Sequence, residues 1–115
     1  MDTKELEFFA EKHKCFERAV DGFWIYVNSW LEEEPAEVEE GFETLDLTSV
    51  VLSKKKIALV VNYSFDEPIR FVTTTMNVSL DKVVIAEYYF VLNLDGNGID
   101  DSLSFHPRPK IEDRI

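Results

Sequence analysis

Residues 93–103 carry the side chains in this sequence that come nearest to a metal site. They read Asn-Leu-Asp-Gly-Asn-Gly-Ile-Asp-Asp-Ser-Leu, so carboxylates and amides surround two glycines. A calcium loop of the EF-hand type needs acids or amides at positions 1, 3 and 5, glycine at position 6, an apolar residue at 8 and a bidentate glutamate at 12. Placing Gly98 at position 6 satisfies the early positions but puts Asp100 at 8 and Ser104 at 12. The pattern fails at two required positions, and we expect no bound metal.

The same stretch fits the turn of a β-hairpin. Asp95-Gly96 and Asn97-Gly98 are turn dipeptides that tolerate positive φ, and alternating apolar runs flank them. After the turn, Asp101 shares its alternation phase with Leu103 and other apolar residues. The favoured interpretation is that the strand begins only after Asp101, because predicted boundaries are imprecise. The alternative is an inward carboxylate, which would need a hydrogen-bond partner.

The remaining reactive side chains form no catalytic arrangement. His13 lies on an apolar helical face and His106 precedes Pro107, and neither has a cysteine or an acid at metal-ligand spacing. Cys15, next to Phe16, is typical of a buried thiol rather than a nucleophile. The sequence contains no glycine-rich phosphate loop and no nucleophile elbow. We therefore expect a protein that is not an enzyme and needs no cofactor.

The front third of the chain has helical periodicity. Asp2 with Glu5 three residues later, or Thr3 beside it, offers an N-cap and a capping box. Side chains of one helical face then recur at steps of three and four: Leu6, Phe9, His13, Phe16, Val20, Phe23, Val27 and Trp30. Asp21-Gly22 interrupts this pattern, so residues 23–31 fit either helix or strand, and the continuing spacing favours helix. Pro35 suits the first turn of a short third segment that Gly41 would end.

From residue 43 the apolar period changes to two. It predicts strands at residues 45–52, 57–65, 72–80, 84–94 and 99–105. Lys54-Lys55-Lys56 and Asp66-Glu67-Pro68 are predicted as turns. Links this short suit antiparallel neighbours, because parallel pairs need long crossovers.

These elements predict an α+β fold in which an N-terminal helical segment packs on a four- to five-stranded antiparallel meander. We expect residues 1–115 to form a single domain, since a chain of this length can bury one core. Residues 1–41 would be helical and acidic, residues 43–106 would form the sheet, and residues 107–115 would be a poorly ordered tail.

The charge of the chain is concentrated in one segment. The net charge is −11, and residues 21–53 contain nine acids and no base. Direct nucleic-acid binding is disfavoured, because phosphate contacts need clustered lysine and arginine. The sequence shows no signal peptide and no apolar run near the ~20 residues of a membrane-spanning helix. We expect a cytoplasmic protein that does not act at a membrane.

Four runs of residues resemble a known class of proteins. They are Phe71–Met76, Ala86–Leu92, Leu94-Asp95-Gly96 and Asp100–Phe105. Together they resemble small bacterial immunity proteins encoded beside polymorphic toxins, including those of contact-dependent growth inhibition systems. The resemblance spans roughly residues 57–106. It implies tight binding to one cognate toxin, and many such toxins are nucleases with basic active sites.

An acidic surface would complement a basic cleft and speed association with it. The residues predicted to bind the partner are Glu32, Glu33, Glu34, Glu37, Glu39, Glu40, Trp30, Asp100 and Asp101. Trp24, Tyr26 and Phe42 adjoin them and suit either anchoring or core packing. Two alternatives remain: a phage-type acidic inhibitor that mimics nucleic acid, and a small-molecule-binding or enzymatic α+β domain with a pocket between helix and sheet.

Overall fold

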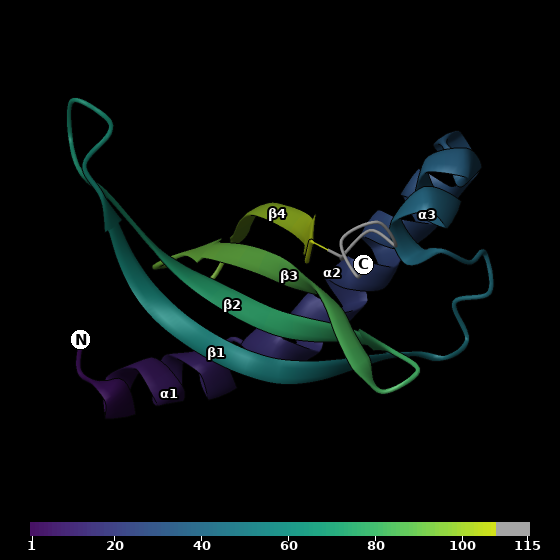
Figure 1. Ribbon diagram of the computed structural model, residues 1–115. Coiled ribbons are helices and arrows are strands. Elements are labelled where there is room, and N and C mark those ends of the chain that lie inside the picture. The colour runs from purple at the N-terminus through teal and green to yellow at the C-terminus, as the bar shows by residue number, and fades with distance from the viewer. Residues whose placement is uncertain (108–115) are drawn as a thin grey trace, which may run out of the picture.

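The computed structural model of the protein describes residues 1–107 and consists of three helices followed by four strands (Figure 1). The elements are α1 (Thr3–Lys12), α2 (Cys15–Glu33), α3 (Pro35–Phe42), β1 (Val50–Asn62), β2 (Ile69–Leu80), β3 (Val83–Asn93) and β4 (Gly98–Phe105). The strands are antiparallel and lie in the order β1-β2-β3-β4. The predicted α+β meander with N-terminal helices is confirmed. Of the tail expected at residues 107–115, residues 108–115 lie outside the described residues.

The N-terminal cap forms as predicted, but the first helix ends earlier than expected. The backbone N–H of Glu5 donates to Oδ1 of Asp2 at 2.8 Å. The break comes at Lys14, which is left-handed with φ of 50°, and residues 23–31 are helical. Gly22 lies inside α2, where it brings the helix close to the sheet, because an added Cβ would lie 2.7 Å from the Tyr88 hydroxyl. The interruption at Asp21-Gly22 is therefore a packing position and not a helix end.

The third helix begins as predicted and ends one residue later than predicted. Pro35 occupies its first turn, where a missing N–H does no harm. Gly41 does not end the helix, which continues to Phe42, and Glu43 takes the left-handed conformation with φ of 62°.

The first strand corrects two predictions at once. Residues 50–62 form one strand, so the predicted strands at 45–52 and 57–65 and the lysine turn between them are wrong. The register shifts between Lys54 and Lys56, which marks a β-bulge. A bulge moves the apolar alternation to the other phase, and this change of phase looked like a break in the sequence. The extra residue, Lys55, is exposed and forms an ion pair with Glu87 of β3. Lysines suit this position because β1 is an edge strand.

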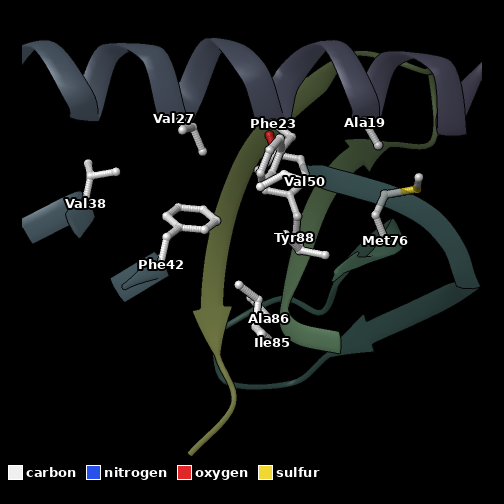
Figure 2. Packing of buried hydrophobic residues seen from close by; sticks show 11 residues of the cluster. Ala19, Phe23, Val27, Val38, Phe42, Val50, Met76, Ile85, Ala86 and Tyr88 are labelled. Carbon is white, nitrogen blue, oxygen red and sulfur yellow. The ribbon is translucent and has the colours of Figure 1, made fainter. Parts of the chain in front are cut away.

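The helices pack on one face of the sheet and form the core there (Figure 2). Figure 2 shows α2 side chains directed towards Tyr88, which is fully buried and meets Phe23 edge to face at a ring-centroid distance of 5.6 Å. The main cluster comprises Ala19, Phe23, Val27, Val38, Phe42, Val50, Met76, Val78, Ile85, Ala86 and Tyr88. A smaller cluster, with α1, comprises Phe9, Cys15, Val72 and Leu92. The three helices are thus held at fixed positions along the sheet.

Candidate acidic interaction site

The short helix α3 places its acidic side chains by burying the opposite side. Val38 and Phe42 are four residues apart and both are fully buried in the main cluster. Residues three and four apart share a helix face, so Glu37, Glu40 and Gly41 lie together on another side. This side borders a surface hollow of about 470 Å³. The hollow is lined by Trp30, Glu37, Glu40, Gly41, Glu43, Phe105 and His106.

Two aromatic rings form a wall of this hollow. The ring centroids of Trp30 and Phe105 lie 6.3 Å apart, and their planes are inclined by 50°. Phe105 also meets the buried ring of Phe42 edge to face at 5.0 Å. A Cβ at Gly41 would lie 2.9 Å from Phe105 and 3.4 Å from Trp30. The glycine therefore leaves room for both rings beside α3, and the core holds Phe105 in place from behind.

A second hollow adjoins the first. It also measures about 470 Å³ and is lined by Ala36, Glu39, Glu40 and Glu43. Glu40 and Glu43 belong to both hollows. Within the described part of the chain, no lysine or arginine lines either of them. The two hollows together form one acidic surface around α3, and we call it the acidic site.

Four acids at this end of the molecule occupy positions that helix electrostatics disfavours. The last turns of α2 and α3 contain no basic residue. Glu32 and Glu33 end α2, and Glu39 and Glu40 lie near the end of α3. A helix C-terminus carries partial negative charge, and a carboxylate there is unfavourable by about 0.3–1 kcal/mol at low ionic strength. Departures of this kind from local rules are expected at functional or strained sites.

The structure brings together only some of the residues predicted to bind a partner. Trp30, Glu37 and Glu40 line the first hollow, and Glu39 lines the second. The residues at the α2–α3 junction are exposed and line neither hollow: Glu32, Glu33 and Glu34. Sequence reasoning missed five lining residues: Ala36, Gly41, Glu43, Phe105 and His106. Glu43 belongs to the same acidic segment, so extending that segment by three residues would have found it.

Asp100 and Asp101 lie on opposite faces of β4. The strand begins at Gly98, so the favoured interpretation that it starts after Asp101 is wrong. Asp101 is partly buried on the helix side, where its carboxylate accepts a hydrogen bond from the Tyr88 hydroxyl at 2.5 Å. Asp100 is exposed and faces the other way. Asp101 lies about 13 Å along the strand from Phe105, at ~3.3 Å per residue. The pair therefore does not form one surface with the acidic site.

The aromatic residues near the acidic segment serve mainly the core. Phe42 is fully buried, and Trp24 and Tyr26 are partly buried against the main cluster. Burial and the adjacent carboxylate of Asp101 raise the pKa of Tyr88 well above its usual value. Cys15 is fully buried, and burial raises the pKa of its thiol.

The stretch at residues 93–97 forms the predicted hairpin turn between β3 and β4. Oδ1 of Asn93 accepts hydrogen bonds from the backbone N–H groups of Asp95 and Asn97, at 3.0 and 2.9 Å. Its side chain is thus turned towards the loop's own backbone. Among residues 1–107, no three or more histidine, cysteine or acidic side chains are grouped so that they could hold a metal ion. No helix within that range is long and apolar enough to cross a membrane.

The acidic site combines carboxylates, two aromatic rings and a concave surface built from three elements. This combination is complementary to a cationic side chain, because carboxylates supply charge and aromatic faces attract cations. Among the described residues that line the two hollows, none is a serine, threonine, cysteine or lysine that could act as a nucleophile. No family model, no curated protein and no solved structure matches this chain.

Proposed function

We propose that this protein is an immunity protein, which neutralises a cognate toxin by binding it directly through the acidic site. The toxin would be a nuclease, and α3 would occlude its basic cleft inside the bacterial cytoplasm. The observation that carries this proposal is the lining of the two hollows. Their described acidic residues are Glu37, Glu39, Glu40 and Glu43, and the lining also includes His106. A cleft that holds phosphate is positively charged and complements such a surface.

The position of the acidic site favours contact with a large partner. The molecule is elongated, with extents of 46 × 30 × 27 Å. Figure 1 shows α3 at the end opposite to α1 and far from the turn between β1 and β2. A surface at the end of an elongated molecule can enter a cleft without other elements colliding with its rim. The partly buried Trp30 would supply an aromatic anchor, the kind of residue that dominates binding energy at interfaces.

Long-range attraction would guide the two proteins together. The field of clustered carboxylates extends about one Debye length, ~8 Å at physiological salt. Complementary charge speeds encounter and rejects wrong partners more reliably than it adds affinity. We therefore expect the association rate to fall steeply as salt concentration rises, while the dissociation rate changes less.

The experiment pairs the protein with the toxin domain encoded by the neighbouring gene. Cells that express this domain should survive only with the immunity protein, and the two purified proteins should co-elute as a complex. Replacing Glu37 and Glu40 by Lys should slow association and weaken protection. The matched control is Asp66→Lys with Glu67→Lys in the exposed β1–β2 turn, which changes the net charge equally at the far end of the molecule.

The control variant should protect cells nearly as well as the unmodified protein. The proposal fails if cells die equally with and without the unmodified protein and no complex forms. If both charge-reversed variants lose protection equally, total charge and not the acidic site determines binding.

A further inference from the structure

We propose that the hollow between Trp30 and Phe105 binds the side chain of an arginine from the partner. The inference rests on the proposed function in taking the toxin as the source of this arginine. It identifies the group that the acidic site recognises. It also explains how occlusion would inhibit a nuclease, because arginines in a basic cleft would otherwise contact phosphate.

The wall of the hollow provides the first part of the argument. Trp30 and Phe105 are separated by 6.3 Å between centroids and are inclined by 50°, so their faces do not stack on each other. Both side chains are only partly buried, and both line the hollow. A cation over an aromatic face is attracted by the ring, and tryptophan is the strongest such partner. An uncharged aliphatic side chain would gain no such attraction.

The carboxylates provide the second part. Glu37 and Glu40 are exposed residues one helical turn apart, and both line the same hollow as the rings. A guanidinium is planar and donates several N–H groups in a fixed fork, so it can lie against a ring and bond a carboxylate with its edge. The ammonium of lysine is a compact point charge that does not stack in this way. The combination of rings and carboxylates therefore selects arginine over lysine.

The size of the hollow agrees with one long side chain and its solvating water. Its volume of about 470 Å³ lies within the range of small-ligand sites. The elements that build it are well anchored, since Phe105 packs on the buried Phe42 and Gly41 admits both rings beside α3. A pre-formed site loses less conformational freedom on binding than one that must be assembled.

The test titrates the full-length protein with a short acetylated and amidated peptide that contains one arginine. The control peptide contains citrulline, which has nearly the same shape and no charge. Nuclear magnetic resonance follows the indole N–H of Trp30, and the indole N–H of Trp24 serves as an internal reference. We expect a saturable shift at Trp30 with the arginine peptide, little change at Trp24, and no saturable shift with citrulline.

Two variants complete the test. Glu37→Gln with Glu40→Gln should weaken peptide binding by about 10-fold or more, since each lost charge-assisted hydrogen bond contributes. Trp30→Leu, followed through the signals of the peptide because this variant lacks the reporter indole, should weaken it by about 3- to 30-fold. Because Trp30 also packs against the core, the glutamine variant, which changes only exposed residues, remains informative if Trp30→Leu fails to fold. Binding to the glutamine variant is measured through the indole N–H of Trp30, which that variant keeps.

Three results would overturn the inference. The first is an equal response to arginine and citrulline, and the second is an equal response at Trp24 and Trp30. The third is that the arginine peptide binds a variant that ends at Pro107 but does not bind the full-length protein. This result would assign the hollow to Arg108 or Lys110 of the same chain. Failure of the inference is distinct from failure of the proposed function. If the toxin binds and the arginine peptide does not, the function stands, and if the peptide binds and no toxin does, the function alone fails.

Discussion

The guanidinium of Arg18 donates a hydrogen bond from Nη1 to the backbone carbonyl of Gly96 at 2.7 Å. The same nitrogen donates to the carbonyl of His13 at 3.3 Å, and the guanidinium lies 5.5 Å from the centroid of the Phe90 ring. One side chain of α2 thus joins the end of α1 to the turn between β3 and β4. Arg18 and Gly96 are 78 residues apart in sequence, so this side chain connects the helical front to the last hairpin.

Arg18→Ala should lower the free energy of unfolding by about 1.5–3 kcal/mol, because it removes charged hydrogen bonds at a partly buried position. Arg18→Lys should recover only part of this loss, because a lysine ammonium is a compact charge that cannot stack on the Phe90 ring as the planar guanidinium does. Urea unfolding followed by circular dichroism measures both variants. The control is Arg70→Ala, at an exposed position on β2, which should change stability by less than ~0.5 kcal/mol. Equal urea midpoints for Arg18→Ala and Arg70→Ala would show that the hydrogen bonds of Arg18 do not stabilise the fold.

Asp100 and Asp101 form a matched pair of neighbouring acids with opposite environments. Asp101→Ala should destabilise the protein by about 1–3 kcal/mol, because it leaves the fully buried Tyr88 hydroxyl without its acceptor. Asp100→Ala should stay within ~0.5 kcal/mol, since its side chain is exposed. Denaturant melts of the two single variants decide the point. Equal effects would mean that the Tyr88–Asp101 hydrogen bond does not stabilise the fold.

The pKa of Tyr88 predicts a loss of stability in base. Burial and the Asp101 carboxylate raise this pKa in the folded state. The unfolded state loses its tyrosine proton near pH 10, while the folded state keeps it. The protonated Tyr88 therefore contributes fully to the free energy of unfolding below pH 10. Above pH 10 this contribution declines by up to about 1.4 kcal/mol per pH unit. Other groups titrate in this range as well, so the measurement is a difference between two proteins.

Tyr88→Phe provides that difference. The variant should be less stable at neutral pH, because Asp101 loses its donor. Between pH 10 and 11 its stability should fall less steeply than that of the unmodified protein. Parallel pH profiles would contradict a raised pKa at Tyr88.

Local patterns in the sequence were sufficient to predict most of the fold. The N-cap at Asp2 depends on residues three apart, and the strands β2, β3 and β4 depend on alternation, with turn dipeptides at residues 95–98 between the last two. Two features had no such local signal. The helix breaks at Lys14, where the sequence has neither glycine nor proline. The break separates α1, which packs on β1, from α2, which packs on β2 and β3. The bulge at Lys54/Lys56 changes the phase of alternation, so one strand resembled two.

The acidic site was only partly predictable for the same reason. The concentration of acids in one segment indicated Glu37 and Glu40, because charge is visible in composition. Phe105 and His106 belong to the last strand and the residue after it, and reach the hollow only through the order of the sheet. The inward position of Asp101 depended on Tyr88, a residue of the neighbouring strand. Contacts of this kind require the register of the strands as well as their existence.

Glu37 and Glu40 offer the sharpest test of whether the acids of α3 serve binding at the expense of stability. Both line the hollow beside Trp30, but Glu37 lies in the first turn of α3 and Glu40 near its end. The helix dipole favours a carboxylate at the first position and disfavours one at the second. Glu40→Gln should therefore stabilise the protein by about 0.3–1 kcal/mol at low salt, and Glu37→Gln should destabilise it by a similar amount.

Both of these variants should weaken binding to the toxin and to the arginine peptide, since each removes a carboxylate from the same hollow. Thermal melts at low and at high salt measure the stability effect, which salt should reduce because it screens exposed charges. Opposite effects on stability combined with the same loss of binding would separate function from folding at these two positions. If Glu40→Gln stabilises the protein and leaves binding intact, the carboxylate of Glu40 is not part of the binding site, and recognition at this end relies on other side chains.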